Sequence, residues 1–324
     1  MNSKQKNIFI TGAVGFIGSE FARQIFNDKN YNRIYLLDSL TYAADLRRIA
    51  NIVNNDRVIL IEGSINNSSI YRSALAECQE AVHFAAESHV DRSIADGFPF
   101  VETNILGSYI FLENCRENQE LRTLFVSTDE VYGSVPDGLS DEASKVEPSS
   151  VYSASKSASD LLALANVHTH AQDLIITRCC NNYGPFQHGE KFIPTVINNI
   201  LRGIPVPIYG SGNNIREWIH VSDHVEALKL LLKKGASGNI YNIGTAERIT
   251  NNEMLKVIID IMKIDGTSFD FVTDRKGHDF RYAIDSTKLK IELRWSPKFS
   301  LQSGITETAN WYSDWYKEEK GIYT

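Results

Sequence analysis

The chain has 324 residues, of which 43% are hydrophobic and 23% are charged, and its formal net charge at pH 7 is -7. This length can bury a large core, and we expect two closely apposed lobes rather than separate domains. The acidic balance and the lack of any lysine- or arginine-rich block argue against a nucleic-acid partner. A phosphate-bearing ligand would therefore have to be held by a local site.

The N-terminal segment and the cysteines bear on the location of the protein. Residues 1–6 are polar, and the apolar run at 8–10 is far too short for a signal peptide or a membrane span. We therefore expect a cytoplasmic protein without a membrane partner. No Cys-x-x-Cys spacing occurs, so the cysteines are expected to be buried, reduced thiols. They are Cys78, Cys115, Cys179 and Cys180.

In chain order, the first half alternates short β-rich apolar runs with longer stretches of helical spacing. The predicted strands are 8–11, 33–37, 58–62, 81–85, 124–127 and 174–178, and the predicted helices are 16–26, 101–118 and 155–171. Such alternation is typical of βαβ crossovers, which build a parallel sheet covered by helices on both faces. The predicted fold class is α/β, with a Rossmann-type doubly wound parallel sheet.

The second half has a different character. After about residue 179 the alternation lapses into loops rich in Gly, Asn and Pro at 183–189 and 203–214, with helical stretches at 221–232 and 251–263. This change predicts a first domain over 1–178, to which some later segments return, and a smaller lobe over 179–324.

A glycine-rich segment follows the first predicted strand directly, with the sequence Thr11-Gly12-Ala13-Val14-Gly15-Phe16-Ile17-Gly18. Glycines in this context permit a tight turn and a close backbone approach to a pyrophosphate, which the next helix faces with its N-terminus. Asp38 ends the second strand, where a carboxylate binds ribose hydroxyls and repels a 2′-phosphate. The segment therefore predicts an NAD site. The order of the elements disfavours the alternative, a glycine turn with a surface aspartate.

Tyr152 and Lys156 form a Tyr-x-x-x-Lys pair at the start of a predicted helix. Their spacing brings both side chains to one helix face. Tyrosine has a reference pKa of about 10, and a neighbouring ammonium stabilises the phenolate, so the pair is expected to act as a base near neutral pH. In an arbitrary helix such a pair would more often be two surface neighbours, and here the glycine-rich segment favours the catalytic interpretation.

The order of the glycine-rich segment, a strand ending in Ser127-Thr128, and Tyr152-x-x-x-Lys156 resembles the extended short-chain dehydrogenase/reductase superfamily over nearly the whole chain. Within it, the segment 127–133, with adjacent Asp129 and Glu130, resembles the dTDP-glucose 4,6-dehydratases. Elimination of water from a sugar needs a base for a carbon-bound proton and an acid for the departing hydroxyl, and paired carboxylates can divide these roles. Similar matches occur at 40–43, 83–93, 177–185, 190–194, 216–218 and 274–282.

The resemblance implies a specific chemistry. Tyr152 would remove the proton of the C4 hydroxyl of dTDP-glucose while hydride leaves C4 for NAD. Glu130 would take the C5 proton, Asp129 would protonate the departing C6 hydroxyl, and hydride would return to C6. Thr128 would hydrogen-bond the C4 oxygen, and Lys156 would also contact the nicotinamide ribose. The product would be dTDP-4-keto-6-deoxyglucose, as in deoxysugar biosynthesis such as that of dTDP-rhamnose, and NAD would stay tightly bound.

By the same resemblance, further residues contact the cofactor and the substrate. The expected cofactor-binding residues are Gly12, Gly15, Phe16, Ile17, Gly18, Asp38, Ser39, Leu40, Thr41, Ser64, Ile65, Phe84, Ala85, Ala86, Thr103, Tyr152, Lys156 and Asn182. The expected substrate-binding residues are Ser88, Thr128, Asn181, Lys191, Phe192, Pro207, Ile208, Tyr209, Arg216, Asn251, Arg275 and His278. The guanidinium groups of Arg216 and Arg275 suit bidentate contacts with phosphate.

The chain departs from the family pattern at a few positions. Ser64 stands where the family has Asp near the adenine, which removes a carboxylate but keeps a hydroxyl. Glu217 replaces Asp, Lys276 replaces Pro, and Arg294 replaces the usual Gly before Trp295. These changes remove no expected catalytic group, although Ser64 is expected to alter NAD affinity and Lys276 to shift substrate preference.

Two other functions compete with dehydration. A nucleotide-sugar 4-epimerase or decarboxylase would share the glycine-rich segment and the Tyr-Lys pair, but the decarboxylases have Ser in place of Asp129 and the epimerases lack the Asp-Glu pair. A catalytically silent NAD-binding regulator is a hypothesis of another class, which the retention of all five expected catalytic residues disfavours. The choice between thymine and uracil in the substrate stays open.

Two further features of the sequence concern a metal site and an oligomer. His220 and His224 have a spacing that could bind zinc on a helix, but no further ligands accompany them, so no metal is expected. The apolar residues at 105–112 and 161–164 would ordinarily be core. In the superfamily the corresponding helices often form a four-helix bundle between two subunits, so we expect a homodimer.

Overall fold

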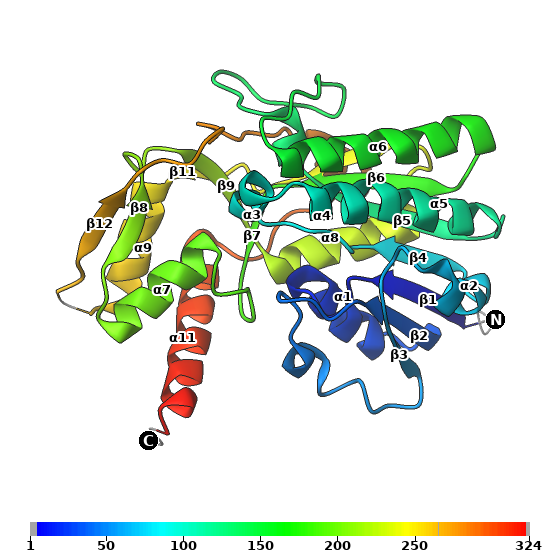
Figure 1. The fold of residues 1–324 in the computed structure, drawn as a ribbon, viewed down its shortest axis with the longest axis horizontal. Coiled ribbons are helices and arrows are strands. Elements are labelled where there is room, and N and C mark those ends of the chain that lie inside the picture. The colour runs from blue at the N-terminus through cyan, green and yellow to red at the C-terminus, as the bar shows by residue number, and fades with distance from the viewer. Residues whose placement is uncertain (1–4, 265, 322–324) are drawn as a thin grey trace.

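The computed structural model describes residues 5–264 and 266–321, and within them the chain forms a seven-stranded sheet of order β10-β6-β5-β4-β1-β2-β3 (Figure 1). Each neighbouring pair of strands is parallel. The strands are β1 (Lys6–Thr11), β2 (Tyr31–Asp38), β3 (Val58–Glu62), β4 (Glu80–His83), β5 (Arg122–Thr128), β6 (Leu174–Cys179) and β10 (Ile240–Ile243). The predicted fold class is confirmed, and the predicted strands in this sheet lie within a few residues of their predicted bounds.

The strand order reverses beside β1, because β2 and β3 extend the sheet on one side while β4, β5 and β6 extend it on the other. Ligands of doubly wound sheets bind at the carboxyl ends of the strands near such a point. Thr11 joins two of these ends: its Oγ1 lies 2.9 Å from Nδ1 of His83 and accepts hydrogen bonds of 3.1 Å from the backbone N–H groups of Phe84 and Ala85. The floor of the crevice is therefore fixed by strand-to-strand contacts.

Helices cover both faces of this sheet. On one face α1 (Phe16–Asn27) packs against α8 (Val221–Lys234), and α8 also contacts β5 and β6. On the other face lie α2 (Arg72–Ala76), α5 (Ser108–Arg116) and α6 (Val151–His170), as Figure 1 shows. The apolar face of α1 buries Phe21, Ala22 and Ile25 completely or nearly so, which anchors the helix whose N-terminus opens onto the crevice.

The helix α6 begins four residues before its predicted start at 155. Ser150 caps it: the Ser153 N–H donates to Ser150 Oγ, and the Ser150 N–H donates to Ser153 Oγ, each at 3.1 Å. A capping box ordinarily carries Glu or Gln at its third helical position. Because Ser153 occupies that position here, the sequence pattern did not indicate a helix start at 151. The earlier start places Tyr152 and Lys156 in the first two turns.

The predicted helix over 101–118 has a more complex structure. It consists of α4 (Phe98–Phe100), a π-helix (Val101–Gly107) and α5, in one continuous run. In the π-helix, the Asn104 side chain accepts from the Glu87 N–H (2.8 Å) and donates to the Glu87 carbonyl (3.0 Å) and to Ser155 Oγ (2.8 Å). The π-helix thus ties the segment after β4 to α6.

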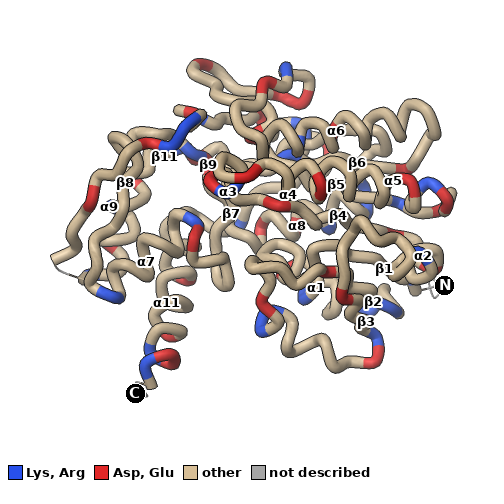
Figure 2. Tube along the Cα trace, viewed as in Figure 1, with Lys and Arg blue, Asp and Glu red and all other residues tan. Residues whose placement is uncertain are grey.

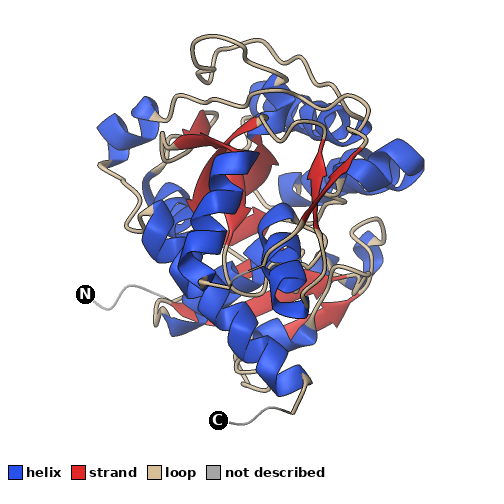
Figure 3. Cartoon of the chain, turned by 90° about the vertical axis from the view of Figure 1, so that its left-hand side faces the viewer, coloured by secondary structure: helices blue, strands red, loops and turns tan. Residues whose placement is uncertain are grey.

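The remaining elements form a smaller lobe beside the sheet. A three-stranded sheet has the order β11-β9-β7, and β8 pairs with β12. Its elements are β7 (Asn181–Tyr183), α7 (Phe192–Arg202), β8 (Val206–Tyr209), β9 (Ile215–His220), β11 (Arg248–Thr250), α9 (Asn251–Met262), β12 (Phe269–Val272) and α11 (Leu301–Glu319). The exception is α10 (Thr287–Leu293), which packs against β10 and α8 of the larger part. Buried Ile197, Ile258 and Ile305 join α7, α9 and α11 into one core. Figure 3 views the molecule from the left-hand side of Figure 1, so that the smaller lobe faces the viewer.

The chain also contains four short helices among the described residues, namely η1 (Leu46–Ile49), η2 (Ser68–Ile70), α3 (Val90–Ala95) and η4 (Asp129–Tyr132).

The side chains of cysteine and of the charged residues are distributed as the sequence suggests. All four cysteines are buried free thiols, as predicted. Figure 2 shows Lys and Arg interspersed with Asp and Glu along the chain. Positive charge that binds a phosphate must therefore come from individual residues placed by the fold.

Candidate active site

The glycine-rich turn lies between β1 and α1, at the carboxyl edge of the sheet. Gly12 has φ +63°, and a Cβ atom there would lie 2.7 Å from the backbone nitrogen of Ala85. A Cβ atom on Gly18 would lie 2.2 Å from the Gly12 carbonyl oxygen. Both positions therefore require glycine, and the turn presents backbone to a cavity lined by Gly12, Gly15, Phe16, Ile17 and Gly18.

Asp38 ends β2 beside this turn and is buried. Its Oδ2 accepts from the Val14 N–H at 2.8 Å and its Oδ1 from the Leu40 N–H at 2.9 Å, while burial raises the pKa of its carboxyl group. A cavity of about 120 Å³ opens next to it. Its lining includes the expected cofactor residues Asp38, Ser39, Thr41, Ser64, Ile65, Phe84, Ala85, Ala86 and Thr103. Leu40 does not line this cavity and contributes through its backbone N–H.

The five expected catalytic residues come together in a neighbouring cavity of about 270 Å³. Thr128, Asp129 and Glu130 follow from the end of β5 into η4, while Tyr152 and Lys156 come from α6. Thr128 caps η4 by accepting from the Glu130 N–H at 3.3 Å. The expected cofactor residues Phe84, Ala86 and Asn182 line the same cavity, so the strand end and the helix face converge on one space next to the glycine-rich turn.

The two adjacent carboxylates have different surroundings. Burial, followed by the charges of Glu130 and Glu217, raises the pKa of Asp129 well above its ordinary value. Among the described residues, Asp129 Oδ2 has no hydrogen-bond partner. Burial also raises the pKa of Glu130, but the positive charges of two arginines and a lysine in the neighbouring cavity counteract this rise. Asp129 therefore favours its protonated form more strongly than Glu130 does.

Tyr152 and Lys156 share a face of α6 and are both buried. Burial, followed by the charges of Glu130 and Cys179, raises the pKa of Tyr152 well above its ordinary value. The direction is opposite to the one that the Tyr-Lys spacing predicts, because burial and negative charge act on the phenol. Lys156 Nζ donates to the Val126 carbonyl at 2.8 Å, and burial lowers the pKa of its ammonium.

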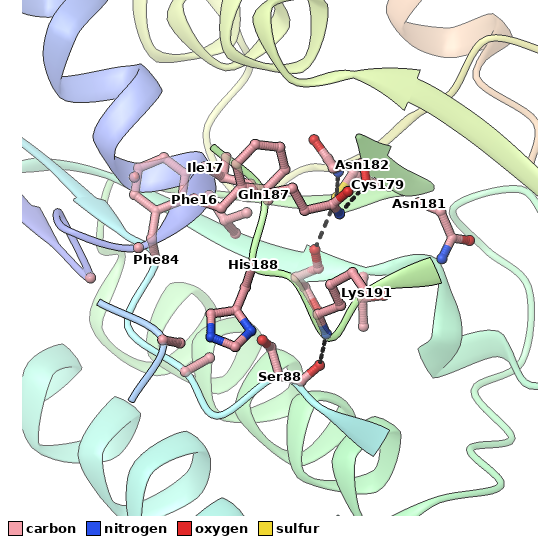
Figure 4. Close-up of a pocket in the computed structure, with 18 of the residues that line it drawn as sticks. Phe16, Ile17, Phe84, Ser88, Cys179, Asn181, Asn182, Gln187, His188 and Lys191 are labelled. Carbon is pink, nitrogen blue, oxygen red and sulfur yellow. Dashed lines mark hydrogen bonds between the residues drawn. The ribbon is translucent and has the colours of Figure 1, made fainter. Parts of the chain in front are cut away.

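A third cavity, of about 460 Å³, lies between the sheet and the smaller lobe. It is lined by all the expected substrate residues except Thr128, namely Ser88, Asn181, Lys191, Phe192, Pro207, Ile208, Tyr209, Arg216, Asn251, Arg275 and His278, and also by Glu130. Lys191 Nζ donates to the Ser88 carbonyl at 2.8 Å (Figure 4). Glu130 thus joins the catalytic cavity to this one.

The two arginines of this cavity differ in how many of their donor groups are already bonded to the protein. Arg216 is buried and donates to the carbonyls of Ile215 and Asp279, each at 2.8 Å, and its guanidinium lies 4.2 Å from the centre of the Tyr282 ring. Arg275 has a looser contact of 3.9 Å with Asp91, and its Nε has no hydrogen-bond partner among the described residues. Arg275 therefore keeps more donor capacity for an anionic ligand.

The sequence missed several residues that line these cavities, among them Arg48, Gln187, His188, Glu190 and Trp218. Figure 4 shows His188 projecting from its loop into the pocket, with Ser88 and Lys191 nearby. Most of them reach the cavities from loops or short helices through tertiary contacts. Glu190 and Trp218 lie within the segments 190–194 and 216–218 that match the family, but no motif or spacing in the sequence indicated Arg48, Gln187 or His188.

His220 and His224 serve structural contacts. His220 caps α8 by accepting from the Ser222 N–H at 3.4 Å, and His224 Nδ1 lies 2.8 Å from Asn182 Oδ1. Burial lowers the pKa of His224 to about 3, so its ring is neutral. In residues 5–264 and 266–321, no group of three or more His, Cys, Asp or Glu side chains is arranged to hold a metal ion.

Comparison with known proteins identifies the family. The family model described as GDP-mannose 4,6 dehydratase matches residues 9–308. A dTDP-glucose 4,6-dehydratase of Streptomyces niveus is 43% identical over 314 residues, covering 95% of this chain and 93% of the relative.

Solved structures agree with this result. DesIV, a dTDP-glucose 4,6-dehydratase from Streptomyces venezuelae solved with NAD and TYD bound, has a TM-score of 0.92 and 42% identity and covers 98% of both chains. The Bacillus anthracis dTDP-glucose 4,6-dehydratase in complex with NAD has a TM-score of 0.90 and 37% identity, covering 98% of this chain and all of that one. The resemblance predicted from the sequence is confirmed, and the chain belongs to the dTDP-glucose 4,6-dehydratase family.

Proposed function

We propose that this protein converts dTDP-glucose to dTDP-4-keto-6-deoxyglucose and water, with an NAD that is regenerated in each turnover. The observation that carries the proposal is the Asp129–Glu130 pair, whose pKa values are shifted unequally in a cavity that also holds Tyr152 and Lys156. Simple oxidation or epimerisation at C4 needs one base and no such pair. The relatives named above support the same substrate.

The residues around the glycine-rich turn fit NAD. Gly12 and Gly18 leave the close backbone surface that a pyrophosphate needs, and buried Asp38 suits two ribose hydroxyls better than a 2′-phosphate. When bound, oxidised NAD supplies the hydride acceptor and, through its positively charged ring, stabilises the Tyr152 phenolate. Tyr152 then takes the proton of the C4 hydroxyl, and Thr128 hydrogen-bonds the C4 oxygen. Lys156 adds a second positive charge on the same helix face.

The elimination step uses the two carboxylates. A ketone at C4 acidifies the C5 proton, which Glu130 removes, since the cations of the substrate cavity hold this residue closer to its ionised form. Asp129 carries the proton that the departing C6 hydroxyl needs, because burial and two neighbouring carboxylates raise its pKa well above the ordinary value and so favour the protonated form. The division of roles therefore follows from the different surroundings of adjacent residues.

We also propose a division of labour along the chain. Residues 1–178 form the NAD-binding domain, and 179–324 form mainly the nucleotide-sugar lobe. Support comes from the location of the glycine-rich turn and of the 460 Å³ cavity. Later segments rejoin the first domain, because α8 packs on the large sheet and β10 pairs with β6.

The proposed reaction can be tested by mass spectrometry on purified protein supplied separately with dTDP-glucose and UDP-glucose, without added reductant. We expect a product lighter by one water from dTDP-glucose. The same loss from UDP-glucose would move the substrate assignment. A product of unchanged mass with a galactosyl group would identify an epimerase, and bound NAD with no turnover of either sugar would favour the regulator hypothesis.

We propose that the protein is a homodimer through the layer of α4, the π-helix, α5 and α6. Exposed apolar residues on the first three are Phe98, Val101, Leu106 and Tyr109. On α6, exposed or half-exposed apolar residues alternate at spacings of three and four: Val151, Ala154, Ala158, Leu161 and Ala165. This is the spacing of helices that pack in bundles. Phe98 is 69% exposed and Leu161 58% exposed, so a second copy would remove substantial apolar surface from water.

Light scattering is expected to give twice the chain mass of 36.5 kDa at micromolar concentration. Leu161→Glu places a charge in the proposed interface and is expected to shift the mass to that of a single chain. Ile291→Glu is a matched control, because Ile291 is 72% exposed on α10, away from this layer. A monomeric parent protein, or a Leu161→Glu variant that stays dimeric, would contradict the proposed interface.

For the location of the protein we propose the cytoplasm. Its proposed substrate is a nucleotide-activated sugar, and its four cysteines are buried free thiols, as is usual in reducing compartments. Among the helices of the described residues, none combines the length and the apolar character that crossing a membrane requires.

A further inference from the structure

Three segments that lie far apart in the sequence meet beside the cofactor cavities: the loop 40–45 after β2, the helix α3, and the loop 184–191 after β7. Arg92 of α3 joins them. Its guanidinium carbon lies 3.6 Å from the centre of the Tyr42 ring, and its Nε and Nη2 donate to Glu190 Oε2, each at 3.4 Å. One arginine thus bridges the first loop to the last.

The other contacts complete a closed ring. His188 meets the Tyr42 ring edge-on with their centres 5.9 Å apart, and its Nδ1 lies 3.6 Å from Glu190 Oε1. The Tyr42 hydroxyl lies 3.5 Å from Glu87 Oε2. Tyr42, Arg92, Glu190 and His188 therefore form a circuit of neighbouring side chains, which we call the clasp.

The clasp lies where the two cofactor cavities adjoin. Ala43, next to Tyr42, lines both the cavity beside Asp38 and the catalytic cavity, while His188 and Glu190 line the catalytic cavity. A dinucleotide that extends from Asp38 to the catalytic residues would pass the segments that the clasp connects.

A buried contact holds the same loops from beneath. Arg48, only 3% exposed, donates to the carbonyls of Val14 (3.0 Å), Ala43 (2.7 Å) and Phe186 (3.1 Å). It therefore ties the glycine-rich turn and the two loops together through buried hydrogen bonds. The Arg92 side chain is 49% exposed, so the clasp can separate without uncovering core while the Arg48 anchor remains.

We propose that Tyr42 and Arg92 retain the dinucleotide by holding these loops closed, so that the clasp must open before NAD leaves. This inference rests on the NAD site of the proposed function. The proposed reaction requires the cofactor to stay bound, because loss of the reduced cofactor between the two hydride transfers would leave a keto sugar that cannot receive its hydride back. Arginine suits the position since its planar guanidinium can stack on a ring and pair with a carboxylate at once.

The test measures release of the cofactor without turnover. Protein loaded with radiolabelled NAD is chased with an excess of unlabelled NAD, and the retained label is followed by rapid filtration. Arg92→Met keeps the length of the side chain and removes both charged contacts, and we expect NAD to leave about tenfold faster, equivalent to about 1.4 kcal/mol. Arg72→Met is the matched control, because Arg72 pairs with Glu117 at a similarly exposed place on α2, and its release rate should equal the parent's.

A second pair of variants isolates the ring. Tyr42→Phe keeps the face on which Arg92 stacks and should release NAD at nearly the parental rate, whereas Tyr42→Leu should resemble Arg92→Met. Parental release rates in both Arg92→Met and Tyr42→Leu would overturn the clasp, and so would a parent protein that binds no NAD. A protein that retains NAD through these residues but does not dehydrate dTDP-glucose would contradict the proposed reaction and still support the clasp.

Discussion

Asp129→Asn is expected to slow the loss of water from dTDP-glucose by about 10²–10⁴-fold, the range in which a positioned general acid contributes. The amide keeps the shape of the side chain but has no acidic proton for the departing C6 hydroxyl. Oxidation at C4 does not need this proton, so NADH should accumulate after substrate is added. Rapid-mixing absorbance of NADH together with mass spectrometry of the sugar would show both effects.

The same variant should be at least as stable as the parent. Burial raises the folded-state pKa of Asp129, so above the pKa of the unfolded chain the folded protein holds a proton that the unfolded chain has lost. This lowers the free energy of unfolding progressively as the pH rises toward the folded-state pKa. Asparagine removes that dependence, and a thermal melt at neutral pH should show an equal or higher melting temperature. Dehydration at the parental rate in a folded Asp129→Asn variant would refute the assigned role.

Tyr152→Phe is expected to reduce turnover by a similar or larger factor, but to block an earlier step. The ring keeps its edge-on contact with Phe100, at 6.3 Å between centres, and loses only the hydroxyl that we propose takes the C4 proton. NADH should therefore not accumulate, in contrast to Asp129→Asn. The measurement is the same rapid-mixing experiment at saturating dTDP-glucose.

Tyr241→Phe provides the matched control, because Tyr241 is also a buried tyrosine, with its hydroxyl donating to Glu292 at 2.8 Å, outside the three cavities. Its turnover should stay near that of the parent. If Tyr152→Phe formed NADH at the parental rate, the C4 proton would have to leave by another route, and the assignment of the base would be wrong.

The sequence predicted the sheet well because its strands combine apolar runs with clear breaks. Runs such as those of β1 and β6 are only six residues long and rich in β-branched residues, which favours a buried strand over a helix. The edge strand β10 was not predicted from the sequence. It is only four residues long, shows no alternation of apolar and polar residues, and is defined by its pairing with β6. The π-helix was not predicted either, because the apolar spacing of 101–107 does not distinguish it from an α-helix.

The candidate site was predictable where local chemistry is strict. Gly12 and Gly18 are forced by backbone contacts, and the Tyr152–Lys156 spacing needs only a helix. Arg48 and His188 could not be found in this way, because the short helix and the loop that bring them to the cavity meet only in the folded chain. The lowered pKa that the sequence predicts for Tyr152 is wrong in direction for a related reason: the spacing shows the nearby ammonium but not the burial or the carboxylates.

The structure shows the surroundings of two residues, Arg294 and Glu217, at which the chain departs from the family pattern. Arg294 ends α10 with φ +56°, the left-handed conformation that favours the glycine usual at this position. Glu217 is fully buried, lies 2.9 Å from Arg248, and accepts from the Ala246 N–H at 2.9 Å. A Cβ atom on Gly244 would lie 2.1 Å from its Oε1, so a larger residue at 244 would have to displace the Glu217 carboxylate.

The route of the chain between its two sheets has a consequence for engineering. After β6 the chain enters the smaller sheet through β7 and β9, returns to the large sheet through α8 and β10, and leaves again at β11. No single cut can therefore release either part as a contiguous piece. A chimera with the sugar preference of a relative would have to exchange the β7–β9 and β11–β12 stretches together and keep α8 and β10 from the recipient. If only one stretch were exchanged, β9 and β11, which pair with each other, would come from different parents.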